Sequence, residues 1–310
     1  MAASSSSAAP PPSPPWTELP DDLTAYILQR LNTEQIVLGA QLVCSTWWRV
    51  CKNPALWRVI DVWHRPCSAG TDKFGNICRC GGRKLRRVCG CSVGRFWNIY
   101  RFAMGRSEGE LVELKLAGFE VDGFLDYVTL RSSQLRRLTL DCYDTTKTEV
   151  LEALKKLPQL EELHLKTRLR FSPKDFETIG SACPVLKSLT YTNSWISKQE
   201  FGPIAYNFSH CWDRTRDFTE HAVAIGKTMP NLCLLQVFGQ RMGMKGLEAI
   251  VDGCPHLDSL DLRGCSSFDM NDRVVKRCYE QIKDVWLCSI ESAYIRYISW
   301  LTKESYQHCH

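Results

Sequence analysis

Hydrophobic and polar residues alternate along this 310-residue chain in two different ways. Between Leu23 and Leu31, apolar residues recur at steps of four, one and three, which is the spacing of one face of an α-helix. A second apolar series runs from Ile36 to Trp48. From Leu111 onward, short segments of the form L-x-x-L-x-L return again and again. The two patterns predict a helical unit followed by an array of repeats.

The helical unit is predicted to span residues 16–61. Pro20 stands where the first helix would begin, because its fixed φ suits an early helical position, and Asp21 and Asp22 suit the positive helix end. A segment of about 45 residues is near the lower size limit for independent folding, and this one carries Trp16, Trp47, Trp48 and Trp57. It either packs on the rest of the chain as an ordinary three-helix cap or offers apolar surface to a partner helix.

The repeats indicate the second architecture. Seven strand segments start 24, 25, 26, 46, 25 and 25 residues apart, and they begin at Leu111, Leu135, Leu160, Leu186, Leu232, Leu257 and Ile282. This period and the L-x-x-L-x-L pattern are typical of a leucine-rich-repeat solenoid. The 46-residue interval predicts an insertion near residues 202–217. The expected fold class is therefore α/β, with a curved parallel sheet inside and helices outside.

Amphipathic helices are expected between the strands. Pro158, Pro184, Pro230 and Pro255 each stand two residues before the next strand leucine, where a proline ends one element and leads into the next. Ser172 and the proline after it form an N-cap followed by a proline at the first helical position. A helix from Arg95 is expected to start the first repeat. One strand–helix unit cannot bury its own apolar face, whereas stacked units share a continuous core.

Strand residues between the leucines point away from that core and form the candidate recognition surface. The residues that we expect to bind a partner there are Lys115, Arg137, Asp141, His164, Lys166, Leu234, Gln236, Phe238, Asp261, Arg263 and Trp286. The charges are mixed, so this surface does not select an acidic or a basic ligand by its field alone. Three of the residues, Leu234, Phe238 and Trp286, are apolar where we expect solvent, and such residues often anchor interfaces.

Composition narrows the class of protein. Hydrophobic residues make up 44% and charged residues 24% of the chain, as in soluble globular proteins. No apolar run approaches the length of a membrane span. Residues 1–15 lack the charged and apolar parts of a secretory signal, so we expect a disordered Pro/Ser tail, with a transit peptide as the alternative. The 16 cysteines are then expected to stay reduced in the nucleus or cytoplasm, most of them as small buried residues.

A basic insert separates the two units, at residues 62–94. Between Arg65 and Arg95 there are eight basic residues and one acidic residue, a net charge of +7 against +5 for the whole chain. The five cysteines between Cys67 and Cys91 include two C-x-C pairs but lack the usual C-x-x-C spacing of a zinc site. A solvated insertion, a loop that contacts phosphate or an acidic partner, and a zinc site all remain open, and we assign no metal.

The helical unit resembles the F-box. The residues that carry the resemblance are Leu19-Pro20, the Ile-Leu-x-x-Leu stretch from Ile27, Val43-Cys44-x-x-Trp47 and Leu56-Trp57. The amino-acid sequence around these anchor residues is similar to that of plant F-box proteins with leucine-rich repeats. The resemblance implies a substrate receptor that docks on the Skp-like adaptor of a cullin–RING ubiquitin ligase (SCF). The adaptor-binding residues that it implies are Leu19, Pro20, Leu23, Ile27, Leu28, Leu31, Ile36, Val43, Cys44, Trp47, Leu56 and Trp57.

No motif of an enzyme accompanies these features. The chain lacks G-x-x-x-x-G-K-[ST], H-E-x-x-H and G-x-S-x-G, and its seven histidines are scattered. We therefore expect a non-catalytic receptor without a cofactor, with 95–300 as the repeats and 301–310 as a tail. Two alternatives stay open. The concave face could sense a small molecule, with the insertion near Trp212 folding over the strands, or the basic insert could bind nucleic acid.

Overall fold

The computed structural model describes residues 19–63, 90–117, 123–142, 145–167, 169–193, 217–238, 240–263, 265, 268–269 and 271–287. The predicted N-terminal tail, most of the basic insert, the insertion near residues 202–217 and the C-terminal tail lie outside these residues. The zinc and nucleic-acid alternatives for the insert, and the proposed domain limits at 15 and 300, therefore stay predictions. The proposed limit at 94 falls inside a described helix, α4 (Gly90–Arg106).

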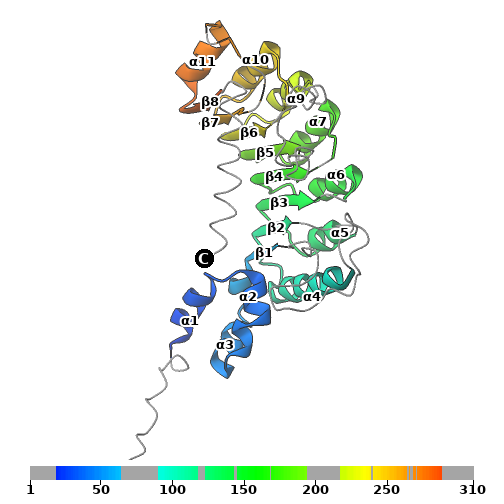
Figure 1. Cartoon of the computed structure of the whole chain (residues 1–310), viewed down its shortest axis with the longest axis vertical. Helices are drawn as coiled ribbons and strands as arrows, with labels where there is room; N and C mark the ends of the chain where they lie inside the picture. Colours follow the sequence, from blue (N-terminus) through cyan, green and yellow to red (C-terminus); the bar gives the residue numbers. More distant parts are fainter. Residues whose placement is uncertain are drawn as a thin grey trace, which may run out of the picture.

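The first part of the chain is a small helical unit (Figure 1). It comprises α1 (Asp21–Leu28), α2 (Thr33–Leu38), α3 (Ser45–Val50) and two short 3-10 turns, η1 (Ala40–Leu42) and η2 (Pro54–Trp57). Pro20 is the N-cap of α1, one residue earlier than the first helical position. Asn32 caps α2 with a capping box, in which its side chain accepts from the backbone N–H of Gln35 and the Gln35 side chain accepts in return.

The second part is one parallel sheet of eight strands in chain order. The strands are β1 (Val59–Trp63), β2 (Glu113–Ala117), β3 (Arg137–Cys142), β4 (Glu162–Thr167), β5 (Ser188–Asn193), β6 (Leu234–Phe238), β7 (Ser259–Asp261) and β8 (Asp284–Trp286). Seven of them are the strands predicted from the repeats. The register is constant, so Leu114, Leu138, Leu163 and Leu189 stand opposite one another.

Helices lie on one side of the sheet, and the strands form the other side (Figure 1). They are α4 (Gly90–Arg106), α5 (Phe124–Thr129), α6 (Lys147–Lys155), α7 (Pro173–Ala182), α9 (Thr219–Thr228), α10 (Met244–Gly253) and α11 (Arg273–Gln281). Ser172 caps α7 with Pro173 at the first helical position, as predicted, and Asp175 completes a capping box. The short helix α5 was not predicted, because its six residues give too few turns for a period.

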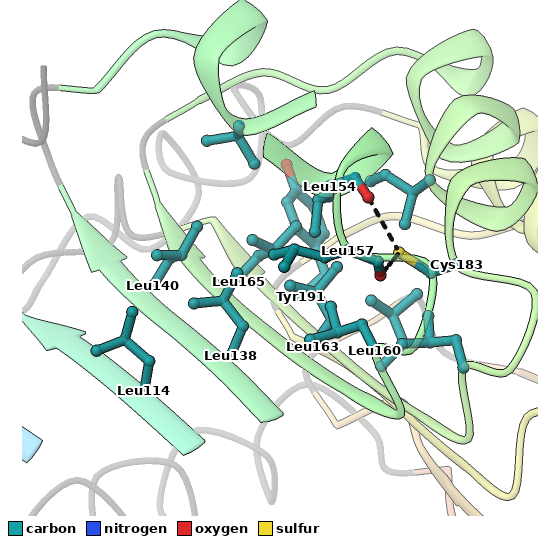
Figure 2. Close-up of a cluster of buried hydrophobic side chains, with 14 of the residues drawn as sticks. Leu114, Leu138, Leu140, Leu154, Leu157, Leu160, Leu163, Leu165, Cys183 and Tyr191 are labelled. Carbon is teal, nitrogen blue, oxygen red and sulfur yellow. Dashed lines mark hydrogen bonds between the residues drawn. The ribbon is translucent and has the colours of Figure 1, made fainter. Parts of the chain in front are cut away.

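The repeat leucines form the core between the sheet and the helices (Figure 2). Leu138, Leu140, Leu163 and Leu165 are buried, and each such side chain contributes roughly 1.5–3 kcal/mol. The Cys183 thiol lies 3.9 and 3.8 Å from the carbonyl oxygens of Leu154 and Leu157 in the preceding repeat, which share its one proton. The cysteine thus links the turn after α7 to the preceding repeat.

The repeats around the 46-residue interval use aromatic residues instead of leucine. Tyr191 takes the last leucine position of β5 and is buried. Its ring stacks on Phe218 at 5.7 Å between centroids and meets the edge of Phe176 at 5.4 Å. Larger rings fill the core at the point where the regular spacing of the repeats is interrupted.

One strand of the sheet was not anticipated. β1 belongs to residues that we assigned largely to the helical unit, yet it pairs in parallel with β2 from Val59 to Trp63. The sequence of β1 lacks the leucine pattern of the repeats. Its core-facing residues are Ile60 and Val62, and both are buried. The helical unit therefore runs directly into the first strand of the solenoid.

Candidate interaction surfaces

The first candidate site is the apolar surface of the helical unit. Six large apolar residues of α1, α2, η1, α3 and the turn after η1 are exposed: Leu23, Tyr26, Leu38, Leu42, Val43 and Trp48. Leu42 is 72% and Val43 60% exposed, although both stand in the middle of a packed helical unit. Several exposed apolar residues on one small unit mark a surface for another protein.

The structure divides the predicted adaptor-binding residues into three groups. Pro20, Leu23 and Val43 are exposed; Leu19, Ile27, Leu31, Cys44 and Trp47 are half-buried; Leu28, Ile36, Leu56 and Trp57 are buried. The last four are buried inside this chain, so their apolar spacing reflects the core of the unit. A helical period alone does not tell the inward face of a two-turn helix from its outward face.

Four exposed residues of this surface were not in the predicted set: Tyr26, Leu38, Leu42 and Trp48. Leu38 ends α2 and Leu42 ends η1, so no single helical period in the sequence links them. The ammonium of Lys52 lies 3.4 Å from the centroid of the Trp48 ring and holds this exposed indole in place. The Asp21–Arg49 ion pair joins α1 to α3 at 2.6 Å.

The helical unit is joined firmly to the sheet. The hydroxyl of Thr33 in α2 accepts a hydrogen bond from the backbone N–H of Asp61 in β1, at 3.0 Å. Trp57 is buried, its indole N–H donates to the carbonyl of Cys51, and its ring meets that of Phe102 in α4 edge-on at 5.8 Å. These contacts protect the edge strand β1, which would otherwise expose unpaired backbone groups.

The second candidate site is the face of the sheet opposite the helices. Its charged end lies on β2 to β4. Glu113 accepts from Lys115 at 3.0 Å and from Arg137 at 2.7 Å. Burial would raise the pKa of Glu113, but the hydrogen bonds from these two cations outweigh it and lower the pKa. The carboxylate therefore stays ionised and orders both cations on the face.

A polar ladder crosses the middle of this face. Thr190 donates to Oε1 of Gln236 at 3.1 Å, and Nδ1 of His164 lies 2.9 Å from the same hydroxyl. Since the hydroxyl has one proton, His164 is the donor through Nδ1–H, and its Nε2 is an acceptor. Burial lowers the pKa of His164, with a smaller opposing effect from Glu162. The imidazole is thus neutral at pH 7 and carries a fixed tautomer.

The far end of the face combines aromatic side chains with one partly buried ion pair. Arg263 donates from Nε to Oδ1 of Asp261 at 2.8 Å and from Nη2 to Oδ2 at 2.5 Å. Its guanidinium lies 5.7 Å from the ring of Phe238 and 5.5 Å from that of Trp286. Such a bidentate pair between aromatic rings is rigid.

The expectation of solvent exposure was right for some of these residues and wrong for others. Trp286 is exposed, whereas Lys115, Arg137, Asp141, His164, Lys166, Leu234, Gln236 and Arg263 are half-buried. Phe238 and Asp261 are buried, at 6% and 2% exposure, and so are Thr190 and Thr192. Asp261 is covered because Arg263 lies against it. The alternation of residues along a strand predicts on which face of the sheet a side chain lies. It does not predict which other side chains cover that position.

The comparisons with known proteins identify the family of the chain. Residues 16–68 match the model of the F-box-like family. The chain is 36% identical over 271 residues to F-box/LRR-repeat protein 23 of Arabidopsis thaliana, covering 87% of this chain and 52% of that protein. It is 35% identical to F-box/LRR-repeat protein 22 and 33% identical to protein 9 of the same plant, covering 75% and 92% of their lengths. The chain belongs to the F-box/LRR-repeat protein family.

This membership supports an adaptor role for the F-box/LRR-repeat chain. The chain spans about half the length of the first of these relatives. In the described residues no group of three or more His, Cys, Asp or Glu side chains could hold a metal ion. The helices that the structure describes include none long and apolar enough to cross a membrane.

Proposed function

We propose that this F-box/LRR-repeat chain is the substrate receptor of an SCF ubiquitin ligase. The observation that supports the proposal most is the exposed apolar surface of the F-box, with Leu42 and Val43 at its centre, on a unit fixed rigidly to the repeats. A Skp-like adaptor binds this surface and connects the chain to the cullin and RING subunits. The receptor acts in the nucleus or cytoplasm, where its free cysteines stay reduced.

The sheet face holds the protein substrate. It offers ordered cations on β2 to β4, the neutral ladder of His164, Thr190 and Gln236, and apolar contacts near Trp286. The function is proximity: binding raises the local concentration of substrate lysines at the ubiquitin-transfer site, as a tether does. No group of this chain takes part in the chemistry.

The adaptor role is tested with a pull-down on a purified Skp-like adaptor. Leu42→Glu combined with Val43→Glu places two charges on the exposed surface and should abolish binding, because neither carboxylate has a partner there. Leu130→Glu is the matched control, since Leu130 is 79% exposed on the repeats and far from the F-box in sequence. Binding of the double variant at the wild-type level would refute the docking surface.

The substrate role is tested by proximity labelling with the full chain. Lys115→Ala with His164→Ala changes the sheet face, whereas Lys227→Ala with Lys245→Ala changes exposed positions of α9 and α10. Proteins that the wild type labels and that accumulate when the F-box variant replaces it are candidate substrates. The sheet-face variant should lose them and the helix-side variant should keep them. Equal loss in both variants, or in neither, would contradict a substrate site on the sheet.

A further inference from the structure

The polar ladder of the sheet face brings two hydrogen-bond acceptors side by side. The Nδ1–H of His164 donates to Thr190, so Nε2 of the neutral ring carries a lone pair. This Nε2 lies 3.9 Å from Oε2 of Glu162, which stands two residues earlier on β4. The distance is too long for a direct hydrogen bond, and neither acceptor has a proton to donate. Both side chains reach solvent, with exposed fractions of 31% and 41%.

A donor nitrogen with two hydrogens fits this pair of acceptors. A nitrogen about 2.9 Å from each acceptor can make two ordinary hydrogen bonds to atoms that are 3.9 Å apart. A backbone N–H has one hydrogen and cannot bind both acceptors at full strength. Primary amides, guanidinium groups and ammonium groups all have at least two hydrogens. The charges nearby and the remaining donors decide between these three.

The surroundings of the pair disfavour a bound cation. Burial is the main cause that lowers the pKa of His164. The ammonium groups of Lys166 and Lys115 act in the same direction. The carboxylates of Glu162 and Glu113 oppose them without cancelling the effect. A cation bound at Nε2 would lie within about 3 Å of the ring position that these surroundings keep uncharged. A neutral amide meets no such penalty.

A donor for the oxygen of an amide stands on the neighbouring strand. Thr139 of β3 pairs with His164 in the register of the sheet, so the two side chains share one face. Thr139 is half-buried, and its hydroxyl makes no hydrogen bond to any other residue that the structure describes. We propose that Glu162, His164 and Thr139 form an amide site, which recognises the side chain of an asparagine or glutamine in the protein substrate.

The amide site reads both ends of the group. The substrate NH2 donates to Nε2 of His164 and to Oε2 of Glu162, and the hydroxyl of Thr139 donates to the amide oxygen. A substrate leucine leaves both acceptors unpaired, and a substrate carboxylate is repelled by Glu162. Gln236 is a positioning residue, because it accepts the proton of Thr190 and thereby keeps Nδ1 of His164 as the donor.

This proposal rests on the substrate site proposed for the sheet face and adds the chemistry that this site selects. The test is selection of phage-displayed random peptides on the purified full chain. Binding peptides should share an asparagine or glutamine at one position. Replacing that amide residue by leucine in a selected peptide should weaken binding about tenfold or more, because two hydrogen bonds are lost.

Two variants show whether the amide site is responsible for this preference. Glu162→Val removes one acceptor without touching the ladder, so it should bind the amide peptide more weakly and discriminate less between the two peptides. Asp284→Val is the matched control, because Asp284 is a carboxylate in line with Glu162 across the register, on β8. It should keep the full preference of the wild type.

The results that would overturn the amide site differ from those that would overturn the substrate site. A shared lysine or arginine in the selected peptides, no shared residue, or an undiminished amide preference in Glu162→Val would refute the amide site alone. Peptides that bind the Lys115→Ala with His164→Ala variant as tightly as the wild type, or the lack of any binding peptide, would count against the sheet face as the substrate site.

Discussion

Single side chains determine the charge of the sheet face and fix the positions of its polar groups. His164 is the clearest case, because its Nδ1–H donates to Thr190 and its ring is half-buried. A neutral imidazole that is fixed in one tautomer recognises a donor, whereas an imidazolium would add a cation to a face that already holds Lys115 and Lys166. Acidification therefore changes both the stability of the repeats and the chemistry that they offer.

The pH dependence of stability follows from that burial. The folded-state pKa of His164 lies below its ordinary value of 6.5, so the unfolded chain takes up the proton first as the pH falls. The free energy of unfolding should therefore decrease from about pH 7 to about pH 5. His164→Asn should flatten this part of the profile, measured by urea denaturation at each pH. The same change at the exposed His256 is the control, and an unchanged slope in His164→Asn would contradict the assignment.

The reactivity of the buried thiols gives a second prediction for single residues. Burial raises the pKa of Cys183 to about 12, and that of Cys254 likewise to about 12. The thiolate is the reactive form, so both should resist alkylation in the folded protein. The half-buried Cys233 should react faster, and urea should abolish the difference. Peptide mass spectrometry after timed iodoacetamide treatment measures each site, and equal rates in native buffer would count against the burial.

Whole helices pack closely where glycines face one another. A Cβ added at Gly253 of α10 would overlap the carbonyl oxygen of Gly226 in α9, and one added at Gly226 would overlap that of Ala249. The glycines let neighbouring repeats approach along the convex side. On the sheet side, the strands keep their register without a break from β5 to β7.

Two substitutions to alanine should therefore have opposite effects. Gly253→Ala forces α9 and α10 apart and should lower the free energy of unfolding by about 1–3 kcal/mol. Gly105→Ala in α4 meets nothing within 4 Å and should raise it by about 0.5–1 kcal/mol, because alanine favours the helix. Thermal and urea unfolding measure both variants. A neutral or stabilising Gly253→Ala would mean that the two helices are farther apart than described.

Sequence reasoning predicted most elements because they follow repeated patterns. The leucine spacing gave seven strands, and Ser172 with Pro173 gave the start of α7. It missed β1 and α5, which carry no repeat signature. It also placed Leu28, Ile36, Leu56 and Trp57 on the adaptor-binding surface, although they are buried, because apolar periodicity does not separate a core residue from an exposed anchor. Phe238 was misjudged for a related reason: strand alternation gives direction, whereas exposure depends on contacts far along the chain.

The F-box packs on the edge of the sheet, so we expect the whole molecule to unfold as one body. Trp57 is the centre of that joint, with contacts to Cys51 and to Phe102 of α4. Trp57→Ala should reduce stability by about 3–5 kcal/mol and should loosen both parts. Wild-type protein should unfold in a single transition by calorimetry, and the variant should unfold earlier. Two separate transitions in the wild type would show that the F-box and the repeats are independent.

Because the register is uniform from β1 to β8, each strand lies at a regular distance from the F-box. Each strand moves the contact point about 4.8 Å away from the F-box, so the repeat on which a client rests fixes how far its lysines stand from a ligase bound at the other end. Two receptors with the same binding chemistry but one repeat more or less would mark different lysines on the same client. Repeat number, and not only surface chemistry, would then decide which position is modified.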